Sequence, residues 1–171
     1  MANLALLLAA SLFALGVSTS QANSAAASLA KAEAVWKAHQ PRSYEFTISV
    51  GCFCPPSPPP TFRVTDGQPA PVGNVDADTL RRYSAFNTIE KLFAELRPAA
   101  AAGPHKMIVT YDDKLGYPTV ADVDPKKDAL DDQFSFTVTN FKILRGGDAA
   151  PIVRQTPPRG GFIVRHDAEI R

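Results

Sequence analysis

Apolar and polar residues alternate over several stretches of the chain, which is the pattern of a strand with one buried face. The clearest case is 44–54, where every second residue from Tyr44 to Cys54 is apolar or cysteine. The prolines of 55–60 end this stretch, because proline cannot donate a hydrogen bond to a ladder. The same reasoning predicts further strands at 61–65, 105–111, 119–124 and 133–144.

Two of these stretches carry a local irregularity. The last predicted strand changes its apolar side after Val138, and a bulge near 139–140 would reconcile its two halves. The turn at Asp66-Gly67 predicts a hairpin whose second arm, 68–72, is weakened by its two prolines. The pattern therefore indicates about five strands.

The first predicted helix covers 24–39. It is rich in alanine, the best helix former, and Pro41 disfavours helical backbone at the residue before it. The helix has only a weak apolar face, to which Trp36 contributes the largest side chain. We expect Trp36 to dock this helix on the sheet; stacking on a ligand is the alternative role.

The second predicted helix covers 88–96, where apolar residues recur with the spacing i, i+3, i+4 and i+7 of a core-facing stripe. Asn87 is the expected N-cap, and Glu90 three residues later completes a pattern like a capping box. Pro98 and then Gly103 are expected to bring the helix to an end.

These elements predict an α+β fold, with an antiparallel sheet of about five strands and two helices on one face, in the order α-ββ-α-βββ. The predicted organisation is a signal peptide at 1–22, a single domain at 23–144 and a flexible tail at 145–171. Proline, glycine and arginine are frequent in the tail, which includes a candidate added strand at 162–164.

The leader 1–22 has the apolar core of a secretory signal, and small residues at the −3 and −1 positions predict cleavage before Asn23. Its apolar run is short for a membrane span, and no stop-transfer sequence follows, so the mature chain is expected to lack a transmembrane segment. The first cysteine, Cys52, lies well beyond the cleavage position. We therefore expect an exported protein, periplasmic or secreted, that is not a lipoprotein.

Charge and motifs narrow the function classes. The chain has 18 basic and 17 acidic residues, so no overall field favours nucleic acid. The signatures G-x-S-x-G, G-x-G-x-x-G and H-E-x-x-H and the P-loop do not occur in the sequence. We therefore expect a protein without catalytic activity and without a cofactor.

Cys52 and Cys54 are the only cysteines, and a disulfide is the default for such a pair in an exported protein. On a strand, residues i and i+2 place their Cα atoms about 6.5–7 Å apart, near the upper limit for a bridge. Three readings stay open: a static local disulfide, a redox-active or soft-metal thiol pair suited to Cu(I), and unpaired buried thiols.

The loop at 112–118 between two predicted strands combines glycine, proline and an aromatic residue, which makes it a candidate binding surface. Packing of Tyr117 back on the sheet is the alternative. Asp112 and Asp124 are expected to cap backbone amides at the two ends of this hairpin, and the aspartates do not follow the spacing of a calcium loop. We predict no metal site. The candidate binding residues are Tyr111, Asp112, Gly116, Tyr117, Pro118 and Asp124.

In their order, these elements resemble a family of small exported bacterial proteins, many of them lipoproteins, that is known only as a domain of unknown function. The resemblance covers roughly 32–144. It implies export and a single domain, and it names no chemistry. It is carried by Trp36, Tyr44, the C-F-C of Cys52 to Cys54, Asp66-Gly67, the T-I-E-x-L-F from Thr88 to Phe93, the Y-D-x-x-x-G-Y-P from Tyr111 to Pro118, Asp124 and Asp132.

The resulting hypothesis is an exported, non-catalytic binding or interaction module with a protein or small-molecule partner in the cell envelope. The rival hypothesis is a thiol redox or copper-handling protein that uses Cys52 and Cys54. A third, an inhibitor of a periplasmic enzyme, is an analogy from the predicted fold alone.

Overall fold

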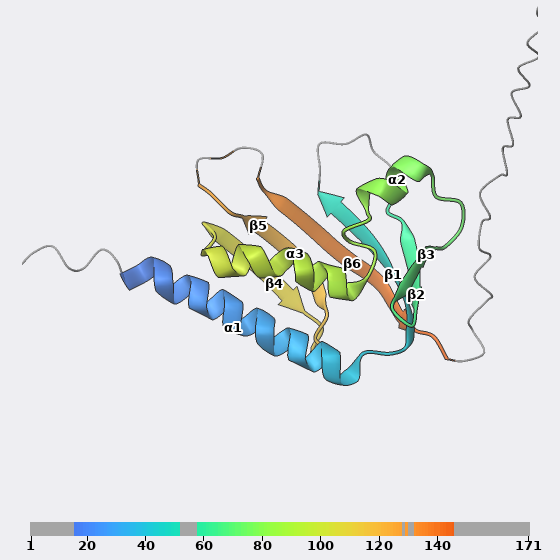
Figure 1. Cartoon of the computed structure of the whole chain (residues 1–171), viewed down its shortest axis with the longest axis horizontal. Coiled ribbons are helices and arrows are strands. Elements are labelled where there is room, and N and C mark those ends of the chain that lie inside the picture. The colour runs from blue at the N-terminus through green and yellow to red at the C-terminus, as the bar shows by residue number, and fades with distance from the viewer. Residues whose placement is uncertain (1–15, 52–57, 128, 130–131, 146–171) are drawn as a thin grey trace, which may run out of the picture.

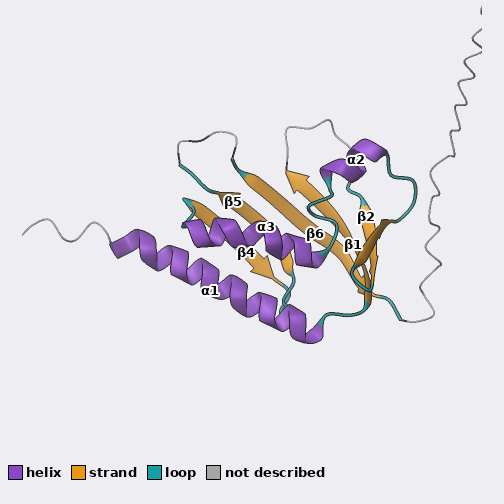
Figure 2. Cartoon of the chain, in the orientation of Figure 1, coloured by secondary structure: helices purple, strands orange, loops and turns teal. Residues whose placement is uncertain are grey.

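The structure is a computed structural model, which describes residues 16–51, 58–127, 129 and 132–145. One six-stranded antiparallel sheet has α1 and α3 on one of its faces (Figures 1 and 2). The helices are α1 (Gly16–His39), α2 (Ala77–Arg82) and α3 (Ile89–Ala102); the strands are β1 (Ser43–Gly51), β2 (Thr61–Thr65), β3 (Gln68–Pro71), β4 (Lys106–Tyr111), β5 (Pro118–Asp124) and β6 (Phe134–Ile143).

The predicted α+β class is confirmed, and the strand order in the sheet is β3-β2-β1-β6-β5-β4. The sixth strand is β3, the hairpin arm that its prolines were expected to weaken. Val72 donates its backbone N–H to the Thr61 carbonyl, so the even-numbered residues of this arm form the hydrogen bonds to β2. Pro69 and Pro71 are odd-numbered and lie on an edge strand, where the N–H that proline lacks would point away from β2.

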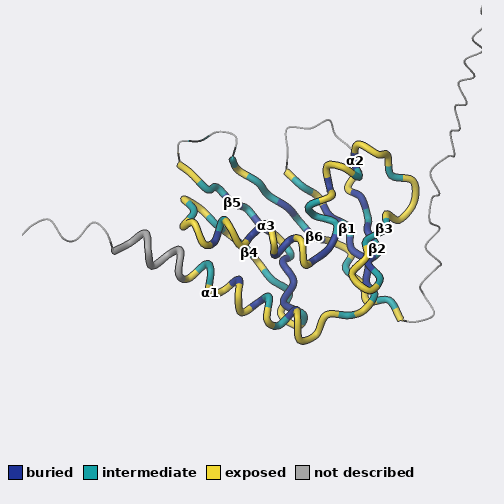
Figure 3. The backbone as a smooth tube through the Cα atoms, in the orientation of Figure 1, coloured by how far each residue is buried: buried dark blue, intermediate teal, exposed yellow. Residues whose placement is uncertain are grey.

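The core lies between the sheet and the two long helices, where the buried residues gather (Figure 3). The expected stripe of α3 is confirmed, because Ile89, Leu92, Phe93 and Leu96 are all buried. From the other helix, the side chains of Leu29 and Trp36 enter the same core. The sheet supplies Tyr44, Phe46 and Ile48 from β1, with Phe62, Val64, Ala121, Val123, Phe136 and Val138 from its neighbours.

The predicted bulge in the last strand is present. Asn140 has φ 53°, and the register between β1 and β6 shifts between Glu45 and Thr47. The shift restores the inward direction of Phe141, whose ring stacks on that of Tyr117 with 4.3 Å between ring centroids. The bulge therefore lets both halves of β6 contribute to one core.

Both ends of α3 differ from the prediction. Thr88 is the N-cap, its Oγ1 accepting from the backbone N–H of Lys91 at 3.2 Å, whereas Asn87 accepts from the Lys91 side chain. Thr88 can replace Asn87 because both side chains offer a capping oxygen. The helix also continues through Pro98 to Ala102, since four alanines favour helix beyond the proline, and it ends at Gly103 with φ 71°.

The first helix starts earlier than predicted. It begins at Gly16, inside the predicted leader, and ends at His39 as expected. Cleavage before Asn23 stays a prediction. Among the described residues, no helix is long and apolar enough to cross a membrane.

Glu90 joins three elements instead of completing a capping box. Its carboxylate accepts hydrogen bonds from Trp36 Nε1 at 3.0 Å and from the Tyr44 hydroxyl at 3.1 Å. The Tyr44 hydroxyl in turn accepts from the backbone N–H of Ile89 at 3.1 Å. Burial, and then the charge of Glu90, raise the pKa of Tyr44, so its hydroxyl stays protonated and donates. Trp36 is 1% exposed, and the prediction that it docks the first helix is confirmed.

We predict that Glu90→Ala lowers the free energy of unfolding by about 2 kcal/mol, because it leaves two buried donors without an acceptor. Glu95→Ala is the matched control, since Glu95 is an exposed glutamate on the same helix; it should change stability by less than about 0.5 kcal/mol. Urea unfolding of both variants measures the difference. Equal losses would show that the bonds to Trp36 and Tyr44 contribute nothing.

Candidate functional site: a cleft beside the free edge of the sheet

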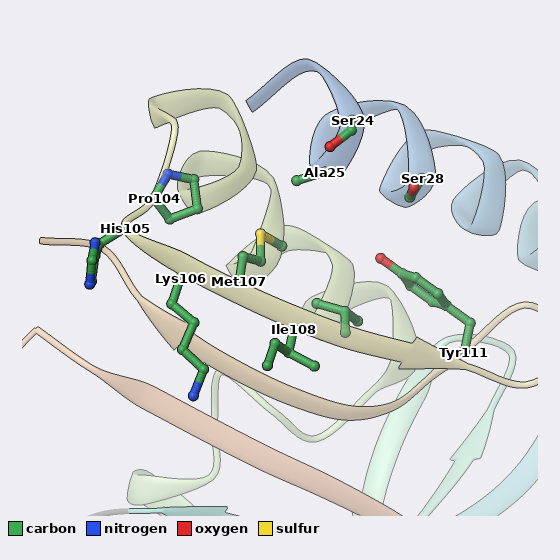
Figure 4. Close-up of a pocket in the computed structure, with 10 residues that line it drawn as sticks. Ser24, Ala25, Ser28, Pro104, His105, Lys106, Met107, Ile108 and Tyr111 are labelled. Carbon is green, nitrogen blue, oxygen red and sulfur yellow. The ribbon is translucent and has the colours of Figure 1, made fainter. Parts of the chain in front are cut away.

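A cleft of about 390 Å³ lies between α1 and β4, at the edge of the sheet (Figure 4). One wall comes from the middle of α1, whereas β4 and the residues that lead into it form the other wall and the floor. Its lining residues are Ser24, Ala25, Ser28, Pro104, His105, Lys106, Met107, Ile108, Val109 and Tyr111.

The floor of the cleft is apolar. Met107, Val109 and Tyr111 lie on the helix-facing side of β4 and are half-buried, in agreement with the alternation from which the strand at 105–111 was predicted. In Figure 4 the Tyr111 hydroxyl points toward α1. Burial raises the pKa of Tyr111 to about 12, so this hydroxyl is neutral at physiological pH and can donate or accept a hydrogen bond.

The backbone of β4 offers unpaired polar groups beside this floor. The N–H of His105 donates to the Pro125 carbonyl on the β5 side, and the register places Met107, two residues further on, opposite Val123. The odd-numbered residues here therefore direct their N–H and C=O groups toward β5. In an antiparallel pair, the residues between them direct these groups away from the partner strand. Lys106, Ile108 and Thr110 therefore point these groups out of the sheet, and no strand in the described ranges pairs with them.

The loop predicted as a binding surface is held against α1. Gly116 has φ 77°, and a Cβ atom there would lie 2.5 Å from the Ala32 carbonyl oxygen, so only glycine allows this approach. Tyr117 is 8% exposed and also contacts the Trp36 ring, with 6.2 Å between centroids. The structure thus shows the packing alternative for Tyr117. Pro118 is buried at the start of β5.

The two predicted caps of this hairpin have different outcomes. Asp112 Oδ1 accepts from the backbone N–H groups of Lys114 and Leu115, at 3.0 and 2.8 Å, which confirms the first cap. Asp124 Oδ1 is buried without a hydrogen-bond partner within the described part of the chain, so the second cap is not formed by this atom. A binding role for the loop stays a prediction, with Asp113 and Lys114 as its exposed side chains.

Cys52 and Cys54 lie outside the described residues, as does the tail from 146 to 171. The described residues contain no group of three or more histidine, cysteine, aspartate or glutamate side chains that could hold a metal ion. The three readings of Cys52 and Cys54, a static disulfide, a redox-active or soft-metal pair and unpaired thiols, therefore stay predictions from the sequence.

Sequence reasoning did not find the cleft. It assigned Tyr111 to a loop surface, and it gave no role to Ser24, Ala25 and Ser28, because nothing local shows that their helix lies beside the edge strand. The one available signal was the alternation that placed Met107 on the inward face.

The face of the sheet opposite α1 and α3 carries a buried carboxylate that the alternation pattern treated as an ordinary polar position. Glu45 is 2% exposed, and its side chain pairs with Arg63 Nη2 at 2.7 Å and with Lys142 Nζ at 2.5 Å. Burial opposes ionisation of Glu45, but the hydrogen bonds and charges of Lys142 and Arg63 outweigh it and lower its pKa. Both oxygens of the Glu45 carboxylate therefore have a cationic partner, and we assign this cluster to the stability of the fold.

The sequence that builds this fold matches a known family. The matching model is described as a family of unknown function (DUF6174), and it covers residues 28–143. The chain belongs to this family. The match runs from the first helix to the end of β6, so it includes all of β4 with its free edge. The predicted membership of a family without established activity is confirmed.

No curated protein and no solved structure gives a significant match to the chain. A function for the cleft therefore has to be argued from the geometry of this chain.

We predict that Glu45→Gln lowers the free energy of unfolding by roughly 1.5–3 kcal/mol at pH 7, because it removes a carboxylate that two cations bind. Because the pKa of Glu45 is lowered on folding, its carboxylate contributes fully to the free energy of unfolding above pH 4.5, its usual pKa. This contribution is lost as the pH falls through the folded-state pKa. The gap between wild type and variant should therefore narrow below about pH 4.5. Urea unfolding between pH 7 and pH 3 tests this, and a gap independent of pH would contradict it.

Proposed function

We propose that the protein is an exported, non-catalytic binding module whose ligand lies in the cleft between α1 and β4. The observation that carries the proposal is the cleft itself, where an apolar floor meets a row of outward-facing backbone donors and acceptors. Its volume of about 390 Å³ lies within the range of roughly 300–1,000 Å³ that is usual for ligand pockets.

The chemistry of the lining favours binding over catalysis. A general base needs a pKa near the working pH, and burial moves the pKa of Tyr111 away from it. In Figure 4 the His105 ring points away from Ser24 and Ser28, so these side chains do not form a nucleophile–base pair. Lys106 is paired with Asp122 at 2.5 Å on the other face of the sheet.

Export is supported by the composition of the leader, and it is compatible with the cleft. The wall residues Ser24, Ala25 and Ser28 all follow the predicted cleavage position before Asn23, so a mature chain keeps both walls. The partner is then a protein or a small molecule of the cell envelope. The net charge of the chain is near zero, so no overall positive field favours nucleic acid as a partner.

The alternative, a thiol redox or copper-handling protein, rests on Cys52 and Cys54 alone. It places the function at the end of β1, which stops at Gly51, and not in the cleft.

The cleft is tested by screening a library of small fragments and hexapeptides against the isotope-labelled full chain, with amide chemical shifts as the readout. We expect hits that shift the amides of β4 and of α1 around Ser24 to Ser28. Ala25→Trp fills the cleft and should abolish these shifts, whereas Ala34→Trp, at an exposed position of the same helix, should leave them. Recovery of each hit with unchanged mass checks that binding is not followed by catalysis.

Two results would contradict the proposal. Hits that shift residues elsewhere, equally in both tryptophan variants, would exclude the cleft as the binding site. A complete lack of hits, both for the wild-type chain and for a chain shortened to end at residue 145, would leave the cleft without a ligand and would favour the cysteine pair.

A further inference from the structure

We propose that the chain's own residues 162–164 occupy this cleft as an antiparallel strand added to β4. The inference rests on the proposed function, because it names the ligand class of that cleft, an extended peptide, and a source for it. The occupant is Phe162, Ile163 and Val164 of the C-terminal tail, which lies outside the described residues.

An extended peptide is the ligand that matches the free edge. Lys106, Ile108 and Thr110 each direct one N–H and one C=O out of the sheet, with the spacing of a strand. A compact ligand could reach only part of this row, whereas an added strand satisfies alternate groups along its whole length. Backbone groups that a ligand covers need such partners, because an unpaired buried polar group is costly.

The side chains of 162–164 suit the two surfaces beside this edge. On an added strand, Phe162 and Val164 share one face and Ile163 takes the other. With the first two directed into the cleft, they meet its apolar floor, and Ile163 lies beside Ile108 on the open face of the sheet. Ile108 is 52% exposed, which makes it one of the most exposed large apolar side chains described.

The tail is long enough to reach the outer edge of β4, and it starts at the end of the sheet from which an antiparallel strand would enter. Both β4 and β6 are antiparallel to β5, so they run parallel to each other, and Ile143 ends β6 at the same end of the sheet where Tyr111 ends β4. A chain that returns from there runs antiparallel to β4. The outer edge of β4 is roughly 15 Å from β6 at a strand spacing of about 4.8 Å, whereas the residues 146–161 can span up to roughly 50 Å.

The amide hydrogens of Ile108 and Thr110 report directly on this strand, because a free edge leaves them open to solvent. We expect both amides to be protected from hydrogen exchange in the wild-type full chain. Ile163→Pro removes an N–H and disfavours strand pairing, so it should speed their exchange by at least about tenfold. Ile170→Pro, in the same tail but outside 162–164, is the matched control and should have no effect.

Three outcomes would overturn the inference. Fast exchange of Ile108 and Thr110 in the wild-type chain would show a free edge. Protection that Ile163→Pro leaves unchanged would show that another segment covers the edge. Protection that rises with protein concentration, together with a dimer in sedimentation, would show that a second copy supplies the strand.

This experiment uses no added ligand, so its failure is distinct from a failure of the fragment screen. A free edge in the wild-type chain is compatible with hexapeptide hits in the cleft. If the tail does occupy the cleft, the same hits should bind Ile163→Pro more tightly than wild type, because the competing segment has been removed.

Discussion

The arrangement of the two long helices on the sheet depends on the hydrogen bonds that the Glu90 carboxylate accepts. It accepts from Trp36 on α1 and from Tyr44 on β1, while its own helix donates the Ile89 N–H to the same tyrosine. One acidic side chain thereby fixes both helices to the central strand. It anchors α1 near its end, where Gly116 allows the hairpin loop to reach the helix backbone. The earlier turns of α1 are left beside β4 (Figure 1), and the cleft lies between them (Figure 4).

The two edges of the sheet differ in a way that supports a binding role for β4. At the β3 edge, Pro69 and Pro71 occupy the outward-facing positions and offer no N–H to an added strand. At the β4 edge, Ile108 and Thr110 carry both a donor and an acceptor, and an apolar floor lies beside them. Within the described ranges, proline blocks one edge of the sheet and no strand pairs with the other, which lies next to a cleft; this is the arrangement expected for binding by strand addition.

Periodicity predicted much of the fold, because burial on one face requires it. The alternation located β1 and β4 to β6, and the change of side in the last strand predicted the bulge at Asn140. Capping was less specific, since Asn87 and Thr88 are both good caps, and the bonds from Trp36 and Tyr44 to Glu90 join residues far apart in sequence. The cleft was missed for a related reason: it depends on strand order and on where α1 lies, which local patterns do not contain.

The mass of the native protein tests the proposed exported binding module against the thiol alternative most directly. The protein would be purified from the exported fraction without reductant and measured intact under native conditions. We predict a chain that begins at Asn23, is lighter by two hydrogens for a closed Cys52–Cys54 bridge, and carries no metal. A chain that retains its leader would contradict cleavage before Asn23, and free thiols or a mass increase that matches copper would move the function from the cleft to the cysteine pair.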